Sequence, residues 1–230
     1  MTENLKIEEQ KNIFEKIASG WKFFVKHYIK FPTFILTHPI KGFDYFKREK
    51  EGKMQVAVVF MLLMILLRIL KFQYTGFVIS QNDPNDLNSI KEIALVVLPI
   101  VLITVANWSI TTLFDGKGTM RDIFMMICYC LYPMLWTETI GLIFSNFITV
   151  EEAGFYYLII GIGTFLTAYL MFFGLLTVHE YGVLKCIGSI IGTIISLLVI
   201  LFVILLAFDL FQQIYGFFYT IYREISLRYF

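Results

Sequence analysis

Long apolar runs alternate with short polar segments along this chain. Five of the runs cover residues 54–70, 93–113, 123–148, 155–178 and 186–208. A helix crosses the ~30 Å hydrocarbon core of a bilayer in about 20 residues, so each run is long enough to span a membrane. The pattern therefore predicts an all-α integral membrane protein with five transmembrane helices.

A polar segment with regularly spaced apolar residues precedes the first run. The residues on the apolar side of its helical wheel are Ile13, Phe14, Ile17, Trp21, Phe24, Val25 and Tyr28, and lysines occupy the other side. This pattern predicts a basic amphipathic interfacial helix that ends at Pro32. The helix either lies on an anionic membrane surface or packs against the protein's own cytoplasmic loops. We group residues 1–53 as a cytoplasmic amphipathic and basic segment.

A second amphipathic pattern follows the fifth run. Apolar residues recur every three or four positions beyond Asp209, with glutamine and charged residues between them. We predict that residues 211–230 form an amphipathic helix on the outer membrane surface, and that residues 54–210 form the five-span domain. A sixth span is the alternative, but Asp209, Gln212 and Gln213 interrupt its apolar run.

Composition and helix-packing residues agree with a membrane-embedded chain. The chain is 58% hydrophobic with a mean hydropathy of +0.73, against roughly 45–50% apolar residues in globular proteins. Its three cysteines have no spacing typical of disulfide or metal sites, so we interpret them as small buried residues. Pro99 and Pro133 predict tolerated kinks. Gly188 and Gly192 form a small-residue face on the fifth run that predicts close helix packing within the chain.

Charge distribution predicts the orientation of the chain. Residues 1–53 contain eleven Lys and Arg against seven Asp and Glu. With the amino terminus inside, eight basic residues near the span ends lie inside and five lie outside. The polar, acidic first residues lack the apolar core of a cleavable signal peptide. We expect a multi-pass protein of the cell membrane with a cytoplasmic amino terminus and an external carboxyl terminus.

Two charged residues stand out inside the apolar runs. Glu138 and Arg68 lie about 16 and 14 residues into their runs, which places them roughly 24 and 21 Å deep at ~1.5 Å per residue. Matching depths predict an intramembrane Glu138–Arg68 pair, with Lys71 one turn further out as a substitute partner. We interpret the pair as structural; the alternatives are a transport or proton-relay site, or an Arg68 that extends unpaired to the surface.

A second polar group lies near the predicted inner face. It contains Asn107, Asp115, Lys117, His179 and Glu180. The sequence Asp-Gly-Lys-Gly predicts a tight turn in which glycines relieve backbone strain, and it lacks the rest of a phosphate-binding motif. His179 and Glu180 have no further ligand pair at helical spacing, so we expect no metal. The group either lines a cytoplasmic vestibule, docks a partner, or consists of ordinary polar residues at a membrane boundary.

Several short motifs, in order along the chain, resemble those of one known family. They are His38-Pro39-Ile40-Lys41-Gly42-Phe43 with Lys47-Arg48-Glu49-Lys50, Gln73-Tyr74-Thr75-Gly76-Phe77, Ala106-Asn107-Trp108 with Asp115-Gly116-Lys117-Gly118, Tyr129 to Pro133, and Tyr222-Arg223-Glu224. From residue 38 onward the chain resembles bacterial-type Yip (Ypt-interacting protein) domain proteins. The resemblance implies five spans and a cytoplasmic amino terminus. It links eukaryotic relatives to Rab GTPases and vesicle traffic, and some bacterial relatives to carbohydrate transport systems.

The sequence shows no catalytic constellation, and we expect neither an enzyme nor a cofactor. We predict a non-enzymatic membrane scaffold or accessory subunit. Its expected partners are membrane lipids and another membrane protein, such as a subunit of a transport system, and not nucleic acid. The alternative is a small-solute transporter or channel that uses Arg68, Lys71 and Glu138, although the five runs show no inverted repeat.

Overall fold

The computed structural model describes residues 20–80, 83, 86–111 and 113–229. Within these residues every regular element is a helix, and five helical segments are long and apolar enough to cross a membrane. They are α4 (Met54–Tyr74), α5 (Ser89–Thr111), α6 with α7 (Met120–Cys130 and Tyr132–Phe144), α8 (Ala153–Val178), which follows the short η3 (Val150–Glu152), and α9 (Val183–Tyr229). The predicted all-α membrane architecture with five spans is confirmed.

The helix before the first span passes through Pro32 instead of ending there. A π-helical segment, η1 (Val25–Lys30), leads directly into α2 (Phe31–Thr37). Its wider turn bonds the Phe31 N–H to the Lys26 carbonyl, and this register accommodates a proline that has no N–H of its own. The helix ends at His38, because the following Pro39 disfavours helical backbone there. The predicted helix residues 13–19 lie outside the described residues.

The helices before the first span pack against one end of the bundle. The aromatic residues Phe43 and Phe46 of α3 (Pro39–Arg48) are buried, and α3 contacts α8. Lys47 Nζ donates a hydrogen bond of 2.7 Å to the Val178 carbonyl. Trp21 and Phe24 remain exposed with their rings stacked on each other. Helices α2 and α3 therefore pack on the protein itself, and contact of Trp21 and Phe24 with a membrane surface stays a prediction.

Tyr129 of α6 lies at the centre of the core and is 1% exposed. The rings of Phe31, Phe46 and Phe60 meet its ring edge-on, with centroids 5.2–6.1 Å away. Its hydroxyl accepts a 3.1 Å hydrogen bond from the Lys53 N–H. This one side chain therefore joins the segment before the first span to the third span. The three cysteines are buried and unpaired, which confirms their interpretation as small core residues.

The prolines and glycines have separable effects on the spans. The third span breaks at Leu131, and Pro133 occupies the first turn of α7, where its missing N–H is tolerated. Pro99 stays inside α5. The Gly188–Gly192 face receives the Phe114 and Ile110 side chains, since a Cβ on these glycines would lie 3.0 and 3.1 Å from them. This face thus packs within the chain, as predicted.

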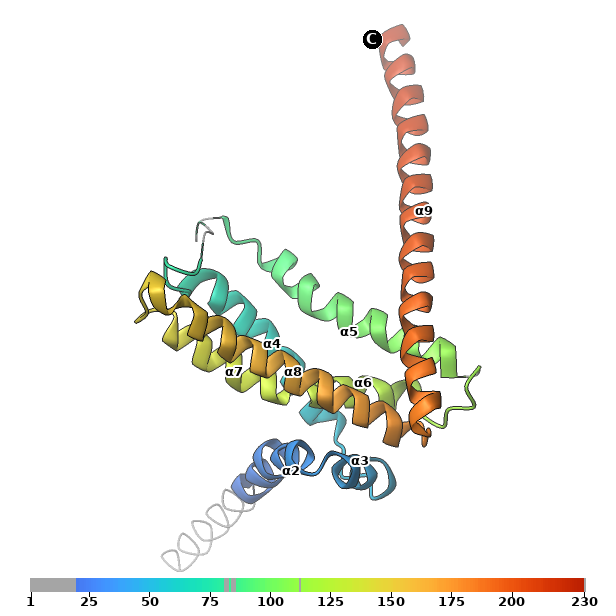
Figure 1. The fold of residues 1–230 in the computed structure, drawn as a ribbon. Coiled ribbons are helices and arrows are strands. Elements are labelled where there is room, and N and C mark those ends of the chain that lie inside the picture. Colours follow the sequence, from blue (N-terminus) through green and yellow to red (C-terminus); the bar gives the residue numbers. More distant parts are fainter. Residues whose placement is uncertain (1–19, 81–82, 84–85, 112, 230) are drawn as a thin grey trace, which may run out of the picture.

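Helix α9 departs from the other spans. Its first turns pack on α5 and α8, and it then extends alone away from the bundle (Figure 1). We expected a separate helix from residue 211, but α9 continues without a break to Tyr229. Two of the polar residues that interrupt the apolar run bond to each other, since Gln213 Nε2 donates a 2.9 Å hydrogen bond to Asp209 Oδ2 one turn earlier. Placement of residues 211–230 on the outer face stays a prediction.

Candidate functional site

The charged residues inside the spans form two ion pairs that differ from the predicted one. Lys71 Nζ, on the last turn of α4, donates a hydrogen bond to Glu138 Oε2 of α7. Arg68 does not pair with Glu138; its Nε donates to Glu92 Oε2 at 2.9 Å. The predicted Glu138–Arg68 pair is therefore corrected to Glu138–Lys71. The sequence predicted only how deep each side chain lies in the membrane. The rotation of α4 about its axis determines which of its two cations faces α7.

Glu92 is the residue that sequence reasoning missed. It lies one position before the second apolar run, but α5 begins at Ser89 and places Glu92 in its first turn, 4% exposed. A signal was present in the sequence, because Asn88 is a residue type typical of the position just before a helix. Asn88 supports this start, because its side-chain oxygen accepts a 3.1 Å hydrogen bond from the Lys91 N–H.

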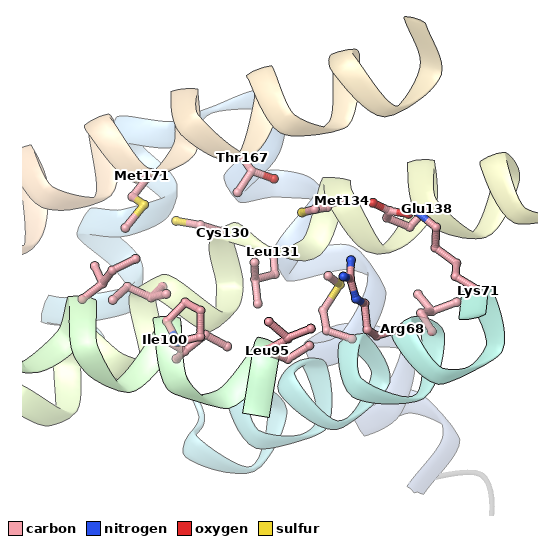
Figure 2. A pocket seen from close by; sticks show the side chains of 16 residues that line it. Arg68, Lys71, Leu95, Ile100, Cys130, Leu131, Met134, Glu138, Thr167 and Met171 are labelled. Carbon is pink, nitrogen blue, oxygen red and sulfur yellow. Dashed lines mark hydrogen bonds and ion pairs between the residues drawn. The ribbon is translucent and has the colours of Figure 1, made fainter. Parts of the chain in front are cut away.

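The Lys71–Glu138 pair and Arg68 border a cavity of about 380 Å³ between α4, α5, α6–α7 and α8. Figure 2 shows Arg68, Lys71 and Glu138 at one end of this cavity and Ile100, Cys130 and Met171 toward the other. We call it the charged cavity. The Lys71 Nζ also lies 6.0 Å from the centre of the Tyr156 ring, a distance at which a cation is attracted to the ring face.

A second cavity of about 550 Å³ continues along α5 toward α9. Its lining is apolar except for Asn107 and Thr193. We call it the apolar cavity. Pro99, Ile103 and Met171 line both cavities, so the two adjoin along α5, and we call them together the groove. The groove is charged where α4 ends and α5 begins, and apolar further along.

At the opposite end of α5, a buried hydrogen-bond network joins α5, α9 and the end of α8. His179 Nε2 lies 2.9 Å from Asn107 Oδ1, and Asn107 Nδ2 donates to Thr193 Oγ1 at 3.0 Å. His179 Nδ1 accepts from the Gly118 N–H at 3.4 Å, so we assign the ring proton to Nε2, which donates to Asn107. Both ring nitrogens of His179 therefore have hydrogen-bond partners, which indicates a structural role for this residue.

The rest of the predicted polar cluster lies at the surface. Lys117 Nζ donates to Glu180 Oε2 at 2.6 Å, and Lys47 Nζ lies 3.7 Å from Glu180 Oε1. Asp115 belongs to neither pair; its exposed carboxylate lies 3.7 Å from Lys185 Nζ. The five predicted residues thus form a buried pair, a surface pair and one separate residue.

The glycines of the Asp-Gly-Lys-Gly turn provide space for the His179 ring. The residue with left-handed backbone is Asp115, with a φ of 54°, and neither glycine has a positive φ. A Cβ on Gly116 or Gly118 would lie 2.7 Å from an atom of the His179 ring. The expectation that these glycines relieve backbone strain is therefore corrected, because their role is close approach.

Burial controls the charge state of His179. Burial, and then the nearby Lys47 charge, lower its pKa from 6.5 to about 4, so the ring is neutral at physiological pH. The pKa of Glu180 is also lowered, because its carboxylate accepts a hydrogen bond from Lys117. Among the described residues, no group of three His, Cys, Asp or Glu is placed to hold a metal ion.

Comparison with known protein families shows to which family this chain belongs. A family model of the Yip1 domain matches residues 34–207. The chain belongs to the Yip1 domain family. No curated protein and no solved structure matches the chain.

The Yip1 domain match includes the structural features described above. It extends from α2 to the middle of α9 and therefore contains both ion pairs, the groove and the His179 network. It ends at residue 207, so the last part of α9 lies beyond the matched Yip1 domain. Membership of this family, together with the five apolar helices, identifies the chain as an integral membrane protein.

Proposed function

We propose that this Yip1 domain protein is a non-enzymatic scaffold or accessory subunit that binds another integral membrane protein through α9. The supporting observation is the exposure of this helix. Every residue from Leu201 to Ile225 is exposed, and this stretch includes many large apolar side chains. Contiguous apolar surface of this extent is typical of a protein or membrane interface.

The length of α9 indicates the kind of partner. Its 47 residues correspond to about 70 Å of helix, more than twice the ~30 Å core of a bilayer. The apolar run up to Phe208 suffices to cross the core. Phe211, Ile214 and Phe218 continue an apolar face beyond it. A partner with its own span and an adjoining apolar surface outside the core would cover both parts, and the family resemblance favours a subunit of a transport system.

The pairing of polar groups supports a structural rather than a catalytic role. At one end of α5, His179 and Asn107 satisfy each other, and at the other end each buried carboxylate has a cationic partner. We also keep the assignment to the bacterial type of the family as a prediction.

The test is photo-crosslinking of the full chain in its native membrane. Photoreactive residues at Phe202, Leu205 and Phe218 should each yield an adduct with the same integral membrane protein, identified by mass spectrometry. The matched control is Leu62 of α4, which is also exposed in a span, at 54%. Adducts with lipid alone, with a second copy of the chain, or with the same set of proteins from Leu62 would overturn the proposal.

A small-solute transporter is the second candidate, since Lys71 and Glu138 line a cavity within the spans. The apolar lining of the rest of the groove disfavours it, because a polar solute would lose its hydration there without compensation. Solute flux into proteoliposomes that is lost in Glu138→Gln and kept in Lys185→Gln would establish transport. Absence of flux for the solutes of the partner system would exclude it.

A further inference from the structure

The groove along α5 has the chemical profile of an amphiphile. One end holds charged side chains, and the remainder is lined mainly by apolar residues. Its two cavities of about 380 and 550 Å³ each have the size of a pocket for a small molecule, which is roughly 300–1,000 Å³. An occupant that matches both ends must carry a polar head and a long apolar tail.

The charged end has a surplus of positive charge. A side cavity of about 320 Å³ brings Lys91 next to Arg68, Lys71 and Glu92. With Glu138 from the charged cavity, three cations therefore face two carboxylates. Among the described residues, Lys91 has no carboxylate partner. The local surplus is thus one positive charge, which one anionic group would neutralise.

Arg68 retains donors for such a group. It contacts Glu92 through Nε, at 2.9 Å, and its two terminal nitrogens make no hydrogen bond to a described residue. Figure 2 shows the guanidinium group reaching into the charged cavity. A planar guanidinium binds phosphate oxygens through paired N–H groups, so these nitrogens are suited to a phosphate.

Thr167 of α8 adds an independent observation in the wall of the same cavity. Its Oγ1 is buried without a hydrogen-bond partner among the described residues. On the same helix, Thr164 and Thr177 donate to the carbonyl four residues earlier, at 3.0 and 2.8 Å. A buried hydroxyl without a partner is costly, and an ester or phosphate oxygen in the cavity would satisfy it.

We propose that this groove binds one anionic phospholipid. Its phosphate lies at Arg68, Lys71 and Lys91, and one acyl chain follows α5 past Ile103 and Met171 toward Leu201. A zwitterionic lipid would leave the surplus charge of the site uncompensated, and a free phosphate would leave the apolar cavity unfilled. Of the exposed α9 surface from Leu201 to Ile225, the inference uses only Leu201 at its start. It therefore stands independently of the proposed partner.

The test compares lipids on the purified full chain by native mass spectrometry and thermal unfolding in detergent. Phosphatidylglycerol and phosphatidylcholine with identical acyl chains are the probes, and inorganic phosphate is the third. We expect phosphatidylglycerol to bind about tenfold more tightly than phosphatidylcholine, the effect of one charge-assisted contact of about 1.4 kcal/mol. Inorganic phosphate should neither stabilise the protein nor compete.

Three variants locate the site. Lys91→Gln should abolish the preference for phosphatidylglycerol without a loss of fold, because Lys91 has no carboxylate partner to strand. Ile103→Trp should obstruct the groove and weaken both lipids. Lys185→Gln removes a cation at the opposite end of α5 and should retain the full preference. Equal binding of the two lipids, an unchanged preference in Lys91→Gln, or competition by inorganic phosphate would each overturn the proposal.

Discussion

The corrected ion pair makes a sharp prediction about stability. We consider Lys71→Met, Glu138→Gln and the double variant. Breaking a well-buried pair by removing one partner costs roughly 3–5 kcal/mol, because the other charge is left uncompensated in a low dielectric. Replacing both partners removes that penalty. The double variant should therefore be less destabilised than the sum of the two single variants.

The burial of the two side chains makes the expected losses unequal. The Glu138 side chain is 9% exposed, whereas the Lys71 side chain is 19% exposed and lies one turn from the end of α4. A stranded Lys71 can extend toward the membrane surface, but the short Glu138 cannot. We expect about 3–4 kcal/mol for Lys71→Met and about 1–2 kcal/mol for Glu138→Gln, with a coupling of about 2 kcal/mol.

The assay is thermal unfolding of the four proteins in detergent. For a chain of this size, 1 kcal/mol corresponds to about 2–4 °C in Tm, so Lys71→Met should lower Tm by about 6–16 °C. A parallel cycle of Arg68→Met with Glu138→Gln is the control and should be additive, because Arg68 pairs with Glu92. Additivity in the Lys71 cycle, or coupling in the Arg68 cycle, would refute the assignment.

Three further predictions concern the His179 network and the topology. The contribution of His179 to the free energy of unfolding should be complete above pH 6.5 and fall toward pH 4, by about 3 kcal/mol at most. The reason is that the pKa of His179 is near 6.5 in the unfolded chain and about 4 in the folded protein. A denaturation midpoint that changes with pH equally in His179→Gln would contradict this. Gly118→Ala should cost about 1–3 kcal/mol of unfolding free energy by crowding the His179 ring, whereas Gly182→Ala, where a Cβ meets no atom within 4 Å, should be nearly neutral; equal midpoints for both variants would rule out the close-approach role. Reporter fusions in the loops after α5, α7 and α8 and at the carboxyl terminus should read inside, outside, inside and outside, and any reversal would overturn the predicted orientation.

The five spans follow from the sequence because membrane insertion depends mainly on the summed hydrophobicity of a local segment. No distant residue is needed to predict that the stretch from Met54 to Tyr74 crosses a bilayer. The burial of the three cysteines and the packing of the Gly188–Gly192 face follow from local character in the same way. The polar start of α5 was harder to predict, since Glu92 belongs to a helix that begins before its apolar run.

The tertiary structure alone decided which polar residues meet. Lys71 and Arg68 are three residues apart on one face of α4, and only the rotation and tilt of that helix direct one to Glu138 and the other to Glu92. His179 meets Asn107 across 72 positions of sequence because α8 ends beside α5. The groove has no signature in any single segment, since all the helices from α4 to α9 supply its walls. A hydrophobic pattern specifies how far each helix extends through the membrane, but side-chain packing between helices sets their rotation, and rotation determines every contact of the candidate sites.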